Sequence, residues 1–236
     1  MQEAIMVGYA DLLKGHSAFL DMLARLYYKP LSQEELDAIA QLSVDDLPED
    51  ARVTDGFSEM LAYLHRGGST LRQDVNVDYT SAFYGINSYE GQVAHPCESV
   101  FVGEEGLLMQ AETRTVYRIY KAECIKKDPE IGIPDDHLSF ELQFLSKMCE
   151  RAAAALETGD MAEAARNIAV QEAFLAEHIQ AWFPAMQKVA LHLLNTPFYK
   201  GLLKATEGYL ELLAADLADV ESALGAPADA SEESAA

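Results

Sequence analysis

Ile133-Pro-Asp-Asp-His-Leu-Ser-Phe-Glu-Leu-Gln-Phe-Leu145 is the stretch from which the fold can be worked out. Pro134 disfavours the helical conformation for the residue before it, and Asp135 or Asp136 can cap the exposed amides of a first helical turn. His137 is therefore expected at a helix N-terminus, beside a carboxylate. There it is either an exposed residue next to the capping aspartate or part of a functional site. The helix itself is predicted by apolar residues at helical spacing, namely Leu138, Leu142, Leu145, Met148, Cys149 and Ala152.

The composition is that of a globular and unusually acidic chain. The 236 residues are 50% hydrophobic, enough for one sizeable core, and the formal net charge is -22. Such a field repels nucleic acid and anionic membranes and favours basic partners. No stretch of about 18 uncharged apolar residues occurs, so we expect no membrane insertion.

The cysteines and the first residues indicate a cytoplasmic protein. Cys97, Cys124 and Cys149 form no CxxC pair, which is typical of reduced intracellular thiols. Glu3 and Asp11 lie in the first stretch, which has no leading basic region, so we expect no signal peptide.

Helical periodicity dominates both halves of the chain. The first half predicts helices over 3–28, with a break near Gly15, and over 32–42, 55–65, 69–84 and 107–122, separated by loops at 45–50 and 86–106. A Gly- and Pro-containing segment at 126–134 leads into the helix that starts near Asp136 and ends near Gly159. Ser32-Gln-Glu-Glu35 is a capping-box pattern that opens the helix over 32–42. A second such pattern, Asp160-Met-Ala-Glu163, opens a helix through Trp182, and two more helices follow, the last from Pro197 to Leu224. The fold class is all-α, a single bundle of about eight to ten helices.

The sequence contains none of the common motifs for catalysis or nucleotide binding, and no standard carboxylate-bridged metal pattern. No Glu-x-x-His pair, Gly-x-Ser-x-Gly elbow or Gly-x-x-x-x-Gly-Lys loop occurs, so we expect neither an enzyme nor a bound cofactor. An improvised metal site using His137, Glu141 and His178 remains as an alternative of another class.

A binding surface has more support than catalysis. Tyr79 and Phe83 stand four residues apart and share one helical face, either as core aromatics or as an apolar groove. Acidic residues lie close to them in sequence, and an acid-rimmed groove suits a peptide that is basic at one end and apolar beyond it. These acids are Asp74, Asp78, Glu90 and Glu98.

Four motifs, in order, resemble the TorD/DmsD/NarJ superfamily of cytoplasmic chaperones that mature molybdenum-containing redox enzymes. They are Tyr79-Thr-Ser-Ala-Phe-Tyr-Gly85, Pro96-Cys-Glu-Ser-Val-Phe101, Pro134-Asp-Asp-His-Leu-Ser-Phe-Glu-Leu142 and Gln171 to Pro184, and the similarity runs from about residue 9 to 215. The chain departs from the family at Ala82, where Leu is common, and at Ile133, where Glu often precedes the proline.

The resemblance implies a chaperone that binds the twin-arginine signal peptide or the apo-form of a molybdenum-containing oxidoreductase subunit. It would hold this client for cofactor insertion before export or assembly. In the nitrate-reductase branch, the client is not exported, and that remains the alternative. The expected peptide-binding residues are Tyr79, Phe83, Glu98, Asp135, Asp136 and His137. Asp136 would orient a guanidinium or cap the helix that positions it.

The same resemblance implies a hinge. Residues 123–136 would connect N-terminal helices, within 1–122, to C-terminal helices, within 137–224, and a disordered acidic tail would follow at 225–236. We expect a monomer, although a linker of this composition also permits a domain-swapped dimer.

Overall fold

We describe the protein from a computed structural model, which describes residues 2–103, 107–109, 111–128 and 130–225. Within these ranges the structure has ten α-helices and no strand, which confirms the all-α prediction. The predicted tail, apart from Gly225, lies outside the described residues. The helices are α1 (Gln2–Tyr28), α2 (Gln33–Ile39), α3 (Ala51–Arg66), α4 (Leu71–Phe83), α5 (Glu98–Val102), α6 (Ala111–Ala122), α7 (Leu138–Thr158), α8 (Met161–Phe174), α9 (Phe183–Leu193) and α10 (Pro197–Gly225). Two short turns complete the elements, the 3₁₀ turn η1 (Val44–Asp46) and the π-helical turn η2 (Leu175–Ile179).

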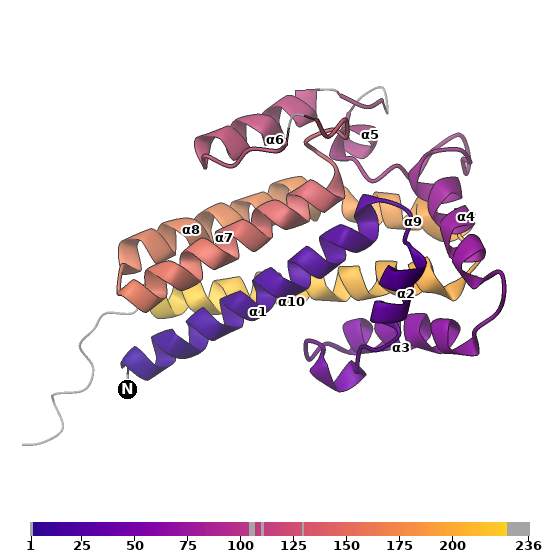
Figure 1. The fold of residues 1–236 in the computed structure, drawn as a ribbon. Helices are drawn as coiled ribbons and strands as arrows, with labels where there is room; N and C mark the ends of the chain where they lie inside the picture. Colours follow the sequence, from indigo (N-terminus) through magenta and orange to yellow (C-terminus); the bar gives the residue numbers. More distant parts are fainter. Residues whose placement is uncertain (1, 104–106, 110, 129, 226–236) are drawn as a thin grey trace, which may run out of the picture.

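Long helices from both halves of the chain form one bundle (Figure 1). Helix α1 packs along α7, α7 along α8, and α10 along α3 and α8. The first and third of these contacts join residues before the predicted hinge to residues after it. In this structure the two halves therefore pack on each other within a single chain.

Helices α3 and α10 approach closely because two glycines face each other. A Cβ on Gly56 would overlap the Gly201 carbonyl oxygen and the Ala205 backbone nitrogen, and a Cβ on Gly201 would overlap the Gly56 carbonyl oxygen. Any side chain at these positions would push the two helices apart.

The caps set several helix boundaries. The predicted capping box at the start of α2 is confirmed, since the Ser32 side chain accepts from Glu35 N and the Glu35 side chain accepts from Ser32 N. Asp160 caps α8 by accepting from Glu163 N. The prediction for α3 started too late: Asp50 accepts from Arg52 N and Val53 N, so the helix begins at Ala51.

Three other boundaries differ from the sequence prediction. Helix α1 runs unbroken through Gly15, because a glycine in a helix interior costs only about 1 kcal/mol against alanine. The predicted loop 86–106 contains the five-residue helix α5. The predicted helix through Trp182 is interrupted by η2, where Gln180 N donates to Leu175 O over 2.9 Å, one residue further back than in an α-helix.

Within the described ranges, none of the helices combines the length and apolar character needed to cross a membrane.

Candidate functional site: a buried polar junction

The two sequence motifs that begin at Pro96 and Pro134 lie side by side in the structure. Cys97 and His137 form an isolated antiparallel bridge. On either side of it, Glu98 N donates to Asp136 O over 3.0 Å and Leu138 N donates to Pro96 O over 2.8 Å. The start of α5 is thereby fixed against the start of α7, which explains why the same two segments stand out in the sequence.

Asp136 caps a helix, but not the one expected. Its side chain is fully buried, with Oδ2 accepting from Ser99 N over 2.9 Å and Oδ1 accepting from the Thr113 hydroxyl over 2.8 Å. Ser99 lies in the first turn of α5, and Thr113 belongs to α6. The prediction that Asp135 or Asp136 caps the following helix is therefore wrong, because the Asp136 carboxylate accepts from the Ser99 amide, 37 residues upstream.

His137 is the true N-cap of α7. Its Nδ1 accepts from Ser139 N over 3.2 Å. The ring is only 3% exposed, so the expectation of a surface histidine is wrong. Desolvation, followed by the neighbouring His95 and Lys127, lowers the pKa of His137 to about 3. The ring is neutral at physiological pH, which leaves Nδ1 free to accept the cap hydrogen bond.

Glu98 reaches a residue that the sequence places far away. It is 4% exposed, and His178 Nδ1 lies 3.0 Å from Glu98 Oε2. His178 belongs to η2, and the extra residue in that turn displaces the downstream side chains from ordinary helical register. The turn thus joins α5 to the C-terminal half of the bundle.

Glu141 is the most unusual member of this cluster. It is fully buried, and burial, followed by the charges of Glu98 and Asp136, raises its pKa well above the ordinary value. Its oxygens face the Trp182 indole N–H and Glu98, without reaching hydrogen-bond geometry with any described residue. Glu141 therefore keeps its proton to higher pH than an ordinary glutamate does. We call the set Glu98, Ser99, Asp136, His137, Glu141 and His178 the polar junction.

Tyr79 and Phe83 lie elsewhere, inside the core. Each is 1% exposed. The Tyr79 hydroxyl donates to Tyr27 O over 2.9 Å, and the Phe83 ring packs edge-on against Tyr27 and Tyr199. Of the two roles considered from sequence, the structure places them as core aromatics. They offer no surface to a peptide in this conformation, and Ala82 beside them is equally buried.

Asp135 is the predicted site residue that reaches the surface. Its side chain is 23% exposed and pairs with Lys127 over 3.2 Å, while its carbonyl accepts from the Tyr120 hydroxyl. It lines a cavity of about 750 Å³ together with Lys121, Lys126 and Lys127. The surface next to the hinge is therefore basic, although the chain as a whole is strongly acidic.

Two features were missed from sequence. Asp78, expected on a groove rim, is buried and accepts from Asn195 N and Thr196 N, which holds the start of α10. A cavity of about 800 Å³ runs along α1 and includes Asp46 and Glu49. In the sequence, only the acidic residues within 45–50 indicate this cavity, because most of its other lining residues come from α1 and α10, which are distant in sequence.

The arrangement does not support the metal alternative. In the part of the chain that the structure describes, no three His, Cys, Asp or Glu side chains are placed to hold a metal ion. His178 instead faces Glu98, and His137 uses Nδ1 as a helix cap.

Comparisons with known proteins agree with the motifs. The nitrate reductase delta subunit family matches residues 46–187. Chaperone protein TorD from Vibrio atlanticus (strain LGP32) is 25% identical over 167 residues, covering 69% of this chain and 75% of the relative. Chaperone protein TorD from Vibrio vulnificus (strain YJ016) is 24% identical over 189 residues, covering 77% and 85%. The selenate reductase assembly chaperone protein of Thauera selenatis is 32% identical over 103 residues, covering 44% and 47%.

The matched range contains the four motifs and the whole polar junction. Its members other than Glu141 have hydrogen-bond partners within the bundle, and the relatives are chaperones. The chain therefore belongs to the nitrate reductase delta subunit family, within the TorD/DmsD/NarJ superfamily of redox-enzyme maturation chaperones, and is not an enzyme.

Proposed function

We propose that this protein is a cytoplasmic chaperone that binds the twin-arginine signal peptide of a molybdenum-containing oxidoreductase subunit. It holds the apo-subunit until the cofactor is inserted and then releases it for export. Family membership carries this proposal, and the net charge of -22 supports it, because a leader with two guanidiniums and an apolar stretch is drawn to an acidic protein.

Most of the predicted peptide-binding residues are buried and act on the fold, not on the peptide directly. Tyr79 and Phe83 are buried in the core between α1, α4 and α10, whereas Glu98, Asp136 and His137 are buried where the start of α5 meets the start of α7. Asp135 is the member whose carboxylate is accessible to a peptide in this conformation.

Calorimetric titration with a twin-arginine leader peptide tests the proposal. We expect saturable binding of one leader per chain, weakened about tenfold when both arginines are replaced by lysine, because lysine lacks the bidentate fork of the guanidinium. Equal affinity for the two peptides would contradict the charge-recognition part of the proposal. Failure to bind either peptide would overturn leader binding.

A second candidate is a chaperone for a subunit that is never exported. The match to the nitrate reductase delta subunit family favours it. Co-purification with a client from which the leader has been removed separates the two functions: retention of the leaderless client supports the second candidate, and its loss supports the first.

We further propose that the protein acts as a monomer, because α1 already packs on α7 across the hinge within one chain. Light scattering would give a mass near 26.0 kDa. A domain-swapped dimer would give twice that value.

A further inference from the structure

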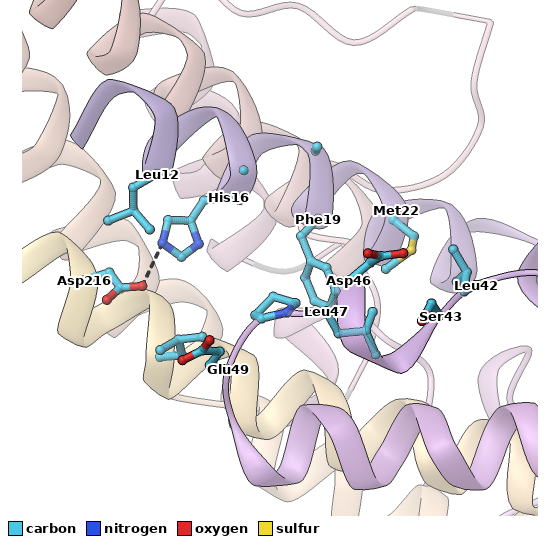
Figure 2. Close-up of a pocket in the computed structure, with 14 residues that line it drawn as sticks. Leu12, His16, Phe19, Met22, Leu42, Ser43, Asp46, Leu47, Glu49 and Asp216 are labelled. Carbon is cyan, nitrogen blue, oxygen red and sulfur yellow. Dashed lines mark hydrogen bonds and ion pairs between the residues drawn. The ribbon is translucent and has the colours of Figure 1, made fainter. Parts of the chain in front are cut away.

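The cavity of about 800 Å³ along α1 is an open groove between α1, the segment 42–49 and α10 (Figure 2). We call it the acidic groove. Its floor is apolar and is made by side chains from all three segments, which are Leu12, Phe19, Met22, Leu42, Leu47 and Leu212. A floor of this kind can hold the apolar face of a short peptide.

Carboxylates line the rim of this floor. Asp46 and Glu49 are exposed, and no lysine or arginine among the described residues forms an ion pair with either. Asp216 accepts a hydrogen bond from His16 Nε2 over 2.9 Å, drawn as the dashed line in Figure 2. Burial lowers the pKa of His16, so at neutral pH the ring is uncharged and does not neutralise Asp216.

The groove continues along α1 into a second cavity of about 490 Å³, lined by residues of α1 and α2. The two cavities share Ala18, Met22 and Leu42. Across the pair, the charged lining consists of five acids and one base, namely Asp46, Glu49, Asp216, Asp21, Glu35 and Arg25. Together they form an extended, acidic and apolar channel on one side of α1.

The cavity beside the hinge has the opposite charge. Lys121, Lys126 and Lys127 line it against the single acid Asp135. An arginine-containing segment would meet like charge there, which costs binding energy, but would meet uncompensated carboxylates in the acidic groove.

We propose that the acidic groove binds the arginine-containing, otherwise apolar segment of the client leader, with the guanidiniums at Asp46, Glu49 and Asp216 and the apolar residues on the floor. This inference rests on the proposed function and specifies where on the chaperone it takes place. It moves leader recognition from the Asp135–His137 turn to the groove between α1, the segment 42–49 and α10.

Charge also argues against two other occupants of the groove. A second copy of this chain carries a net charge of -22. The C-terminal segment 226–236 contains Asp229, Glu232 and Glu233 and no basic residue. Each would bring further negative charge to the rim.

The test compares three double variants of the full chain, each removing two negative charges. D46N/E49Q neutralises the groove rim. D128N/D135N neutralises acids at the hinge. E34Q/D37N changes exposed acids of α2 that do not line either cavity along α1. Each variant is titrated with the twin-arginine leader, and circular dichroism melting confirms that it folds.

We expect D46N/E49Q to weaken leader binding by about tenfold or more, and the other two variants to change it by less than about threefold. Loss of binding in D128N/D135N with full binding in D46N/E49Q would overturn the groove assignment and leave the proposed function standing. Absence of binding to the unaltered protein would instead overturn the proposed function itself.

Photo-crosslinking locates the peptide without relying on substitutions. A leader carrying benzoylphenylalanine next to its arginine pair is irradiated with the unaltered chaperone, and the linked protein fragments are identified by mass spectrometry. We expect links to residues within 12–22, 42–49 or 212–216. Links confined to 117–135 would place the leader at the hinge and contradict the inference.

Discussion

The polar junction and the acidic groove both contain several carboxyl groups, but those of the junction are buried, whereas Asp46 and Glu49 on the groove rim are exposed. In the junction, Asp136 accepts two hydrogen bonds and burial raises the pKa of Glu141. In the groove, Asp46 and Glu49 stay exposed. Buried carboxylates contribute to stability or strain within the fold, whereas exposed and unpaired ones are free to meet a ligand. Variants of the junction should therefore change stability, and variants of the groove should change binding.

The largest effect is expected from Asp136→Ala. It leaves Ser99 N–H and the Thr113 hydroxyl without their acceptor in a buried site, which should lower the free energy of unfolding by about 2–5 kcal/mol. Urea denaturation followed by circular dichroism measures it. Asp135→Ala is the matched control, since its partly exposed pair with Lys127 should contribute less than about 1 kcal/mol. Equal losses in the two variants would contradict the structural role of Asp136.

His137 should make the junction sensitive to acid. Its folded pKa of about 3 lies below the ordinary 6.5, so the unfolded chain binds a proton first and stability falls as pH drops from about 6.5 toward 3. The slope is at most about 1.4 kcal/mol per pH unit. Asn at this position keeps a cap acceptor but cannot titrate, so His137→Asn should reduce the acid loss by up to about 3 kcal/mol at pH 4.

Urea denaturation at pH 4 to 7 measures this change, with His65→Asn as a control at an exposed histidine. Parallel stability curves for the wild type and His137→Asn would show that His137 is protonated equally in the folded and unfolded chains.

Glu141 should have the opposite pH dependence. Its folded pKa is raised, so above the unfolded value the folded chain retains a proton that the unfolded chain has released, and stability falls as pH rises. Glu141→Gln removes this loss. Between pH 5 and 8, the variant should gain stability relative to the wild type as pH rises, by at most about 1.4 kcal/mol per pH unit.

The same denaturation experiment on exposed Glu177→Gln controls for loss of one charge. A constant difference between Glu141→Gln and wild type across this range would mean that Glu141 is already ionised in the folded protein.

The smallest effect on stability is expected in the groove. D46N/E49Q removes two exposed charges that have no described partner, so the free energy of unfolding should change by less than about 0.5 kcal/mol, the usual range for surface substitutions. Thermal melting checks this, beside E34Q/D37N. A loss comparable to that of Asp136→Ala would remove the distinction between the two regions.

Local signals were sufficient for most of the helices. Apolar spacing, the Ser32–Glu35 capping box, Asp160 and Pro197 act within a few residues, and the structure bears out the elements that they predict. Helix α5 is different, because its five residues are held by Asp136 from 37 positions away. A window along the sequence cannot detect such a partner.

The candidate sites were harder to predict than the fold. The importance of the 133–137 and 96–99 segments could be seen, but which side chain caps which helix depended on their pairing in space. Helical spacing put Tyr79 and Phe83 on one face without showing that Tyr27 and Tyr199 cover that face. The acidic groove draws its walls from α1, 42–49 and α10, so no single stretch displays it.

The π-helical turn at Leu175–Ile179 also has a consequence for how this gene can change over time. One inserted or deleted residue in a helix rotates everything after it by about 100°. The turn already contains one residue more than an α-helical turn, so a deletion within it would restore an ordinary helix and keep Trp182 in register, whereas a further insertion would turn Trp182 out of the core. Insertions here should therefore be eliminated by selection, whereas a deletion that spares His178, the residue facing Glu98, should be tolerated.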